Sequence, residues 1–69
     1  MKVEIISLNI LSHSLSHATS SGGKSIKFDK NEFFANSLKY IEDHITKHGF
    51  DIVNVHGSDQ MYVYHLIQP

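Results

Sequence analysis

Histidine is the residue type with the most chemical potential in this chain, which carries six histidines among its 69 residues. His44 and His48 are four residues apart, so on a helix their imidazoles would stand one turn apart, close enough to chelate a divalent metal together. A catalytic zinc site also needs a third ligand and a general base, and the chain has no His-Glu-x-x-His motif. We therefore expect the pair to flank the apolar stripe of a helix and to interact with its C-terminal dipole, with metal binding as the alternative.

The segment Ala18–Ser25 matches a loosened phosphate-binding loop, because it ends in Gly-Lys-Ser. Such a loop needs a buried strand before it and a helix that begins at the lysine, so that backbone amides and the helix dipole converge on the phosphate. Strand-like residues follow Lys24 instead, and the chain is too short for a supporting parallel sheet. We expect a flexible Ser/Gly turn here.

Other catalytic arrangements find no support in the residue pattern. Serines 14 and 16 lie near His13 and His17, but within a polar segment that offers no rigid, oriented base. Glu42 and Asp43 are sequence neighbours and would point to different sides of a helix. The chain has no cysteine, which excludes thiol nucleophiles, disulfides and iron–sulfur clusters. We expect a protein that is not an enzyme and needs no cofactor.

Charge and composition limit the classes of partner that the protein can bind and the cellular compartment in which we expect it. The net charge is −1, and all six basic residues are lysines. Arginine is the usual residue for gripping phosphates and guanine edges, so we expect no nucleic-acid partner. No apolar run approaches the roughly 18 residues that span a bilayer, so no membrane segment is expected either. The absence of cysteine favours a reducing cytoplasm.

Alternating apolar residues predict a strand at 3–11, with Ile6, Leu8 and Ile10 on one face. Residues 12–25 are rich in serine and glycine and are expected to form a flexible loop, with a short strand possible at Ser25–Phe28. The spacing of Asp29 and Glu32 resembles a capping box and predicts a helix over 30–48. Its predicted apolar stripe comprises Phe34, Leu38, Ile41 and Ile45. Gly49 is expected to end the helix, because C′ needs a left-handed backbone.

Residues 51–56 and 60–67 are rich in β-branched and aromatic side chains and predict an antiparallel hairpin in which His56 opposes Met61. Phe50 should contact Ile45, which places its face of the hairpin, including His65, under the helix. The other face would then form an exposed interface between copies of the chain, made of Val53, Val55, Tyr62, Tyr64 and Leu66. The alternative is that this second face is the core and the histidine-bearing face points outward.

Together these elements predict a single α+β domain over residues 1–69. It would have a three- to four-stranded antiparallel sheet with one helix packed on one face.

Residues 37–69, with the first strand, resemble a family of short, uncharacterised bacterial and phage-borne proteins known only as a domain of unknown function. Its members have a helix ending in Gly-Trp-Glu-Leu-Val and a final strand that closes near a basic residue and proline. The corresponding residues here are Gly49-Phe50-Asp51-Ile52-Val53 and Tyr62–Pro69, with Phe50 in place of tryptophan and Gln68 in place of the basic residue. The resemblance implies the strand–helix–hairpin order and no activity.

These observations predict a small non-enzymatic interaction protein that forms a homo-oligomer, a dimer first of all, through its sheet. It would act by binding a partner protein, as a regulatory or phage-type inhibitor does. The alternative is a small-ligand or metal-binding module, with the ligand held at the oligomer interface by histidine, serine and tyrosine side chains.

Overall fold

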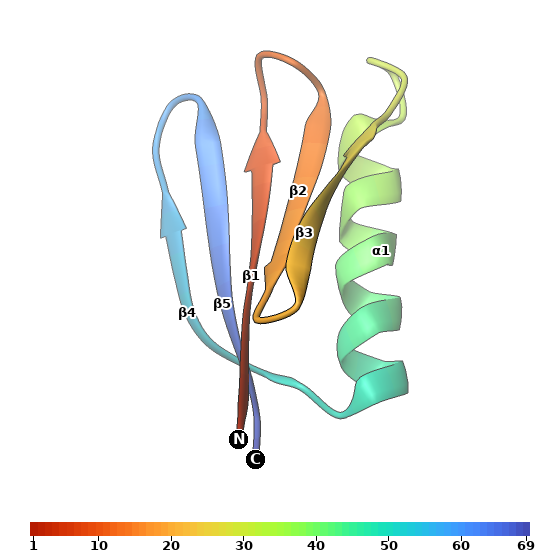
Figure 1. The fold of residues 1–69 in the computed structure, drawn as a ribbon. Helices are drawn as coiled ribbons and strands as arrows, with labels where there is room; N and C mark the ends of the chain where they lie inside the picture. The colour runs from red at the N-terminus through yellow and green to blue at the C-terminus, as the bar shows by residue number, and fades with distance from the viewer.

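The computed structural model describes residues 1–69 as one antiparallel sheet with a single helix across one face (Figure 1). In chain order the elements are β1 (Lys2–Asn9), β2 (Ser14–Thr19), β3 (Gly22–Lys27), α1 (Phe33–His48), β4 (Asp51–Gly57) and β5 (Met61–Gln68). The strand order across the sheet is β3-β2-β1-β5-β4. This confirms the predicted α+β class, with five strands rather than three or four.

The Ser-rich segment that we expected to be a flexible loop forms most of the hairpin β2–β3 instead. Backbone pairing with β1 stabilises β2 despite its polar composition, and every second residue of β2 still turns inward, with Leu15 and His17 buried. The turn is closed by Thr19, whose hydroxyl donates to the Gly22 carbonyl at 2.9 Å and accepts from the Ser21 amide at 3.1 Å. Gly22 has φ 134°, a conformation that side-chain-bearing residues rarely adopt.

Strand β1 is the central strand, and its alternation sets which face is covered. Ile6 pairs with His17 of β2 and Tyr64 of β5, so these side chains project from the same face as the buried Leu8. Glu4 belongs to the same alternation and is also turned toward the helix. The buried apolar core comprises Ile6, Leu8, Leu15, Phe33, Ile41, Phe50 and Leu66.

Helix α1 ends where the sequence predicted and begins later. Gly49 is left-handed with φ 71°, and the amides of Gly49 and Phe50 both donate to the Ile45 carbonyl, at 3.0 and 3.1 Å. At the other end the predicted capping box is not formed. Glu32 is the N-cap and makes no side-chain capping hydrogen bond, so the helix begins at Phe33 rather than near residue 30.

The buried face of α1 is also rotated from the predicted stripe. Phe33, Ser37 and Ile41 are buried, whereas Phe34 and Leu38 are half exposed. The buried residues Phe33, Ser37 and Ile41 follow one another at steps of four, and this series was missed because its middle member is polar. Ser37 is fully buried despite its hydroxyl, and a small side chain at this position suits close packing of the helix on the sheet.

A β-bulge in β4 reverses the predicted hairpin faces. His56 pairs with Val63 rather than with Met61, and the register shifts between Ile52 and Asn54. Because the bulge inserts one residue, Phe50 lies under the helix as predicted, but on the same side as Leu66. Leu66 is fully buried and Tyr64 packs against the core, which contradicts their placement on an exposed face.

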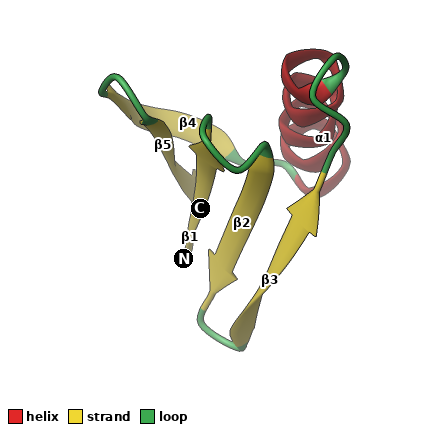
Figure 2. Cartoon of the chain, turned by 90° about the horizontal axis from the view of Figure 1, so that it is seen from above, coloured by secondary structure: helices red, strands yellow, loops and turns green.

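The half of the sheet formed by β4 and β5 lies on the side away from α1 (Figure 1), and the view from above shows the same arrangement (Figure 2). Here the helix leaves part of the sheet uncovered, and large apolar side chains on this face are exposed as a result: Ile52, Val55 and Tyr62. Val53 is exposed at the bulge, and Met61 is exposed on the opposite face, where it pairs with Asn9. His65, which we expected under the helix, is half-buried and pairs with Ile5 of β1 on the opposite face.

Candidate functional site

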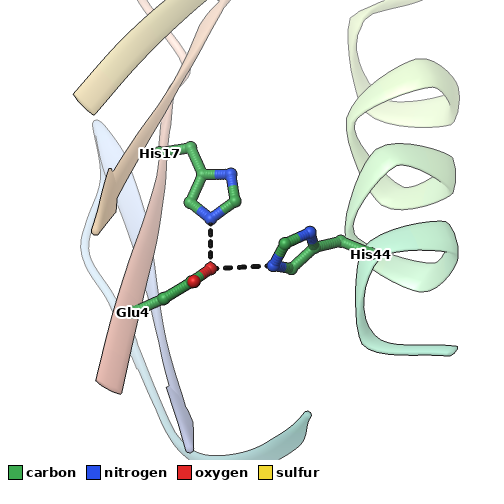
Figure 3. Close-up of side chains that lie close together, drawn as sticks. All are labelled: Glu4, His17 and His44. Atoms are coloured by element: carbon green, nitrogen blue, oxygen red, sulfur yellow. Dashed lines mark hydrogen bonds and ion pairs between the residues drawn. The ribbon is translucent and has the colours of Figure 1, made fainter. Parts of the chain in front are cut away.

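A buried carboxylate lies between two histidines at the contact of sheet and helix. The Glu4 oxygen Oε1 accepts a hydrogen bond from His17 Nε2 at 2.6 Å and from His44 Nε2 at 2.8 Å. Figure 3 shows both imidazole rings pointing at this one oxygen, His17 from β2 and His44 from α1. Three elements distant in the sequence therefore supply one cluster, which we call the Glu4–His17–His44 cluster.

His17 is positioned on both of its ring nitrogens. Its side chain is buried, and its Nδ1 lies 2.7 Å from the hydroxyl oxygen of Tyr40 on α1. Because Nε2 donates to Glu4, a neutral His17 carries its proton on Nε2, so Nδ1 accepts the proton of the Tyr40 hydroxyl. Tyr40, His17 and Glu4 thus form a hydrogen-bonded chain from the helix to the central strand.

His44 is held by ring contacts as well as by its hydrogen bond to Glu4. Its ring lies edge-on to the His17 ring, with centroids 4.5 Å apart, and stacks on Phe50 at 5.0 Å. Phe50 is in place because Gly49 ends the helix and turns the chain back to the sheet. The helix terminus therefore also fixes the orientation of His44.

The electrostatics of the cluster favour an ionised glutamate. Burial raises the pKa of Glu4, but hydrogen bonds and positive charge from His17 and His44 lower it, and the net pKa lies below the ordinary value of 4.5. Glu4 is therefore a carboxylate at neutral pH and carries the charge that a metal ligand needs.

An open pocket of about 440 Å³ adjoins the cluster and includes the rings of His17 and His44 in its wall. Six of its nine lining residues have polar side chains, two are glycines, and Tyr40 is the one hydrophobic residue. The other lining residues come from the β2–β3 hairpin and the end of α1: Thr19, Ser21, Gly22, Gly23, Lys24 and His48. The cluster is thus accessible to small molecules although its ligand atoms are buried.

The structure places the residues of the three predicted sites, which are the histidine pair, the phosphate-type loop and the sheet interface, as follows. His44 and His48 are adjacent as expected, with ring centroids 4.9 Å apart, but only His44 belongs to the cluster. Lys24 and its flanking residues form a strand–turn–strand unit instead of a strand–loop–helix, as a phosphate loop would require. Of the five predicted interface residues, Val53, Val55 and Tyr62 are exposed, and an interface made by them stays a prediction.

Glu4 and His17 were missed by sequence reasoning. Glu4 has the same strand parity as Ile6 and Leu8, so an acid on a core-facing position was the available signal. His17 shares parity with Leu15, but the strand itself was not recognised within the Ser-rich segment. Neither signal reveals that both side chains meet His44, because that depends on where the helix crosses the sheet.

No protein-family model matches the chain, and no curated protein or solved structure matches it either. The resemblance of residues 37–69 to the family of short bacterial and phage-borne proteins therefore stays a prediction. Helix α1 is not long and apolar enough to cross a membrane.

Proposed function

We propose that this protein is a small metal-binding module that holds one divalent transition-metal ion between Glu4, His17 and His44. The proposal rests on one observation. The carboxylate oxygen and the two Nε2 atoms all lie within 4.8 Å of one another in a largely buried setting. A carboxylate and two imidazoles form a common ligand set for zinc and for non-haem iron, in sites that keep at least one coordination position open.

The surroundings of His17 support this proposal. A metal-ligating histidine usually has its second ring nitrogen fixed by a hydrogen bond, which orients the ring and sets its tautomer. Tyr40 occupies that position on Nδ1 of His17, at 2.7 Å. Nε2 is then the nitrogen that faces both Glu4 and the ion.

The distances fit metal binding with a small adjustment. The two Nε2–Oε1 distances are 2.6 and 2.8 Å, which are hydrogen-bond lengths. Tetrahedral zinc with bonds of about 2.0–2.1 Å holds its ligand atoms about 3.3 Å apart. The two pairs that include Oε1 must therefore open by about 0.5–0.7 Å, a rotamer-scale movement that needs no change of fold.

Zinc is the ion we expect to bind best among those available to cells. The donor set contains imidazole nitrogen and carboxylate oxygen and no sulfur, because the chain has no cysteine. Such a set suits Zn²⁺, Fe²⁺, Co²⁺ and Ni²⁺ and disfavours the thiolate-seeking Cu⁺. It is also poor for Ca²⁺ and Mg²⁺, which prefer oxygen ligands throughout.

Titration with zinc tests the proposal directly. Chelator-competition titration and native mass spectrometry should show one zinc ion per folded chain. Replacing Glu4→Gln keeps a hydrogen-bond acceptor for both histidines but removes the negative charge. We expect this variant to lose about 100-fold or more in zinc affinity, because the charged oxygen ligand is lost.

The matched control is His48→Gln, which removes a neighbouring histidine that lies outside the cluster. Zinc affinity should stay within about threefold of the parent value, well under the tenfold or greater loss usual for a lost ligand partner. If His48→Gln weakened zinc as much as Glu4→Gln, the ion would be bound by the helical pair instead. If neither variant nor the parent chain bound zinc, the cluster would be a purely structural hydrogen-bond network.

A second candidate function is protein–protein interaction through the uncovered half of the sheet. The observation that favours it is the exposure of Val53, Val55 and Tyr62, at 54%, 51% and 37%. Adjacent exposed apolar side chains beyond the edge of a helix are typical of an interface. We propose self-association into a homodimer on this surface, as part of an interaction protein of the regulatory or inhibitor type in a reducing cytoplasm.

Sedimentation analysis tests this second candidate. Val55→Glu places a charge on the exposed surface without removing a core residue, so the variant should fold and sediment as a monomer while the parent chain is dimeric. Lys39→Glu, on the exposed side of α1, should leave the dimer intact. A parent chain that is monomeric at all concentrations would contradict the proposal.

A further inference from the structure

The pocket beside the Glu4–His17–His44 cluster has the composition of an anion-binding site. It is lined by the amino group of Lys24, by hydroxyl groups and by three histidines, and it contains no aspartate or glutamate. Glu4, behind two of these histidines, is already engaged by His17 and His44. A negatively charged ligand in this pocket therefore meets the Lys24 ammonium and the Ser21 hydroxyl, and no carboxylate lines the wall.

Lys24 is the residue best placed to attract such a ligand. Its ammonium group lies over the Tyr40 ring, 5.5 Å from the ring centroid, and it forms no salt bridge with any acid of the chain. The cation–π contact with Tyr40 keeps the charge at the pocket rather than free in solvent. An unpaired, oriented ammonium is a point charge suited to a carboxylate or a phosphate.

Metal binding would change whether the Tyr40 hydroxyl can donate a hydrogen bond into the pocket. In the metal-free chain, neutral His17 donates through Nε2 to Glu4, and the Tyr40 hydroxyl donates its proton to Nδ1. A metal on Nε2 excludes a proton there, so the neutral ring must carry its proton on Nδ1. Nδ1 then donates to the Tyr40 oxygen, and the Tyr40 hydroxyl proton is free to turn toward the pocket.

We infer that the pocket binds a small anion bearing a carboxylate or phosphate group, held by Lys24 and, once the metal is bound, by the Tyr40 hydroxyl. This inference rests on the proposed metal site. His17 links the two ligands. A metal on its Nε2 changes its tautomer, and the tautomer decides whether Nδ1 accepts a hydrogen bond from the Tyr40 hydroxyl or donates one to it. The two ligands should therefore bind cooperatively, and each should raise the affinity for the other by the same factor.

The experiment follows the amide signals of Gly22, Gly23 and Lys24 by NMR while acetate or methyl phosphate is added at constant ionic strength. Both titrations are run at pH 8, where unperturbed histidines are neutral, with and without one equivalent of zinc. We expect saturable binding of at least one anion, tightened about tenfold or more by zinc. The tighter of the two anions identifies the class, carboxylate or phosphate.

Two variants separate the contributions of charge and hydrogen bonding. Lys24→Ala should weaken the anion about tenfold in both the metal-free and the zinc-loaded protein. Its control is Lys27→Ala, three residues along β3, which pairs with Ser14 on the opposite face and should have no effect. Tyr40→Phe should leave the metal-free affinity unchanged and reduce the gain from zinc, because only the charge of the ion then contributes.

The outcomes are distinct. If zinc binds but neither anion saturates, the anion site is refuted and the metal site stands. If an anion saturates in a chain that does not bind zinc, the metal site is refuted, and with it the coupling. If zinc tightens the anion equally in the parent chain and in Tyr40→Phe, the tautomer link through His17 is refuted.

Discussion

Zinc is expected to raise the midpoint of thermal unfolding by about 10–20 °C when its free concentration is about a hundred times its dissociation constant. The three ligands come from β1, β2 and α1, so the unfolded chain offers no preformed site and zinc binds the native state selectively. At that concentration the binding contributes about 2.7 kcal/mol to the free energy of unfolding. In a domain of this size each kcal/mol shifts the midpoint by about 4–8 °C.

Circular dichroism melts in chelator and in zinc measure this effect, and chelation should return the midpoint to its metal-free value. In Glu4→Gln the shift should nearly vanish, whereas His56→Gln, an exposed histidine on β4, should keep all of it. An equal zinc shift in Glu4→Gln and in the parent chain would show that the stabilising ion lies elsewhere.

Leu66→Ala is expected to lower the free energy of unfolding by about 2–5 kcal/mol, the usual cost of a cavity in a packed core. Leu66 is fully buried among the seven apolar residues of the core, on β5, where it pairs with Glu4 and Ile52. Leu11, by contrast, is 68% exposed, and Leu11→Ala should change the free energy by no more than about 0.5 kcal/mol. Urea denaturation of the two variants gives the comparison.

A domain of this size rarely has more than about 3–5 kcal/mol of stability to lose, so Leu66→Ala is expected to be largely unfolded. Leu66→Val provides the measurable counterpart, with an expected loss of about 1 kcal/mol. Equal and small effects at both leucines would place Leu66 at the surface, as the exposed-interface interpretation of the hairpin required.

Local signals in the sequence predicted β1, the end of the helix and the C-terminal hairpin, but they missed β2 and did not predict which faces of the hairpin are buried. Gly49 predicted the end of the helix, alternation predicted β1, and the density of β-branched and aromatic residues predicted β5. The bulge between Ile52 and Asn54 carries no sequence signature of its own, yet it reverses the relation between Phe50 and the rest of the hairpin. One inserted residue was enough to exchange the predicted core and surface.

The residues of the candidate site were also only partly predictable from the sequence. His44 could be singled out because helical spacing pairs it with His48. Glu4 was not singled out, because an acid in a strand is ordinarily assigned to the solvent side, although its parity with Ile6 and Leu8 places it on the core-facing side. Only the tertiary arrangement, with α1 crossing the sheet over β1 and β2, converts two isolated polar residues and one helical histidine into a single cluster.

The strand order also determines how the chain must fold. The pairs β1–β2, β2–β3 and β4–β5 each join consecutive strands, whereas β1–β5 alone joins the two ends of the chain, with Lys2 opposite Gln68. Entropy opposes this last pairing most, because it closes the longest loop, and pairings of high sequence separation slow folding. The N-terminal meander β1–β2–β3 and the C-terminal hairpin β4–β5 can therefore form as local units. We expect the pairing of β1 with β5 to be the step that sets the rate at which the two units become one domain.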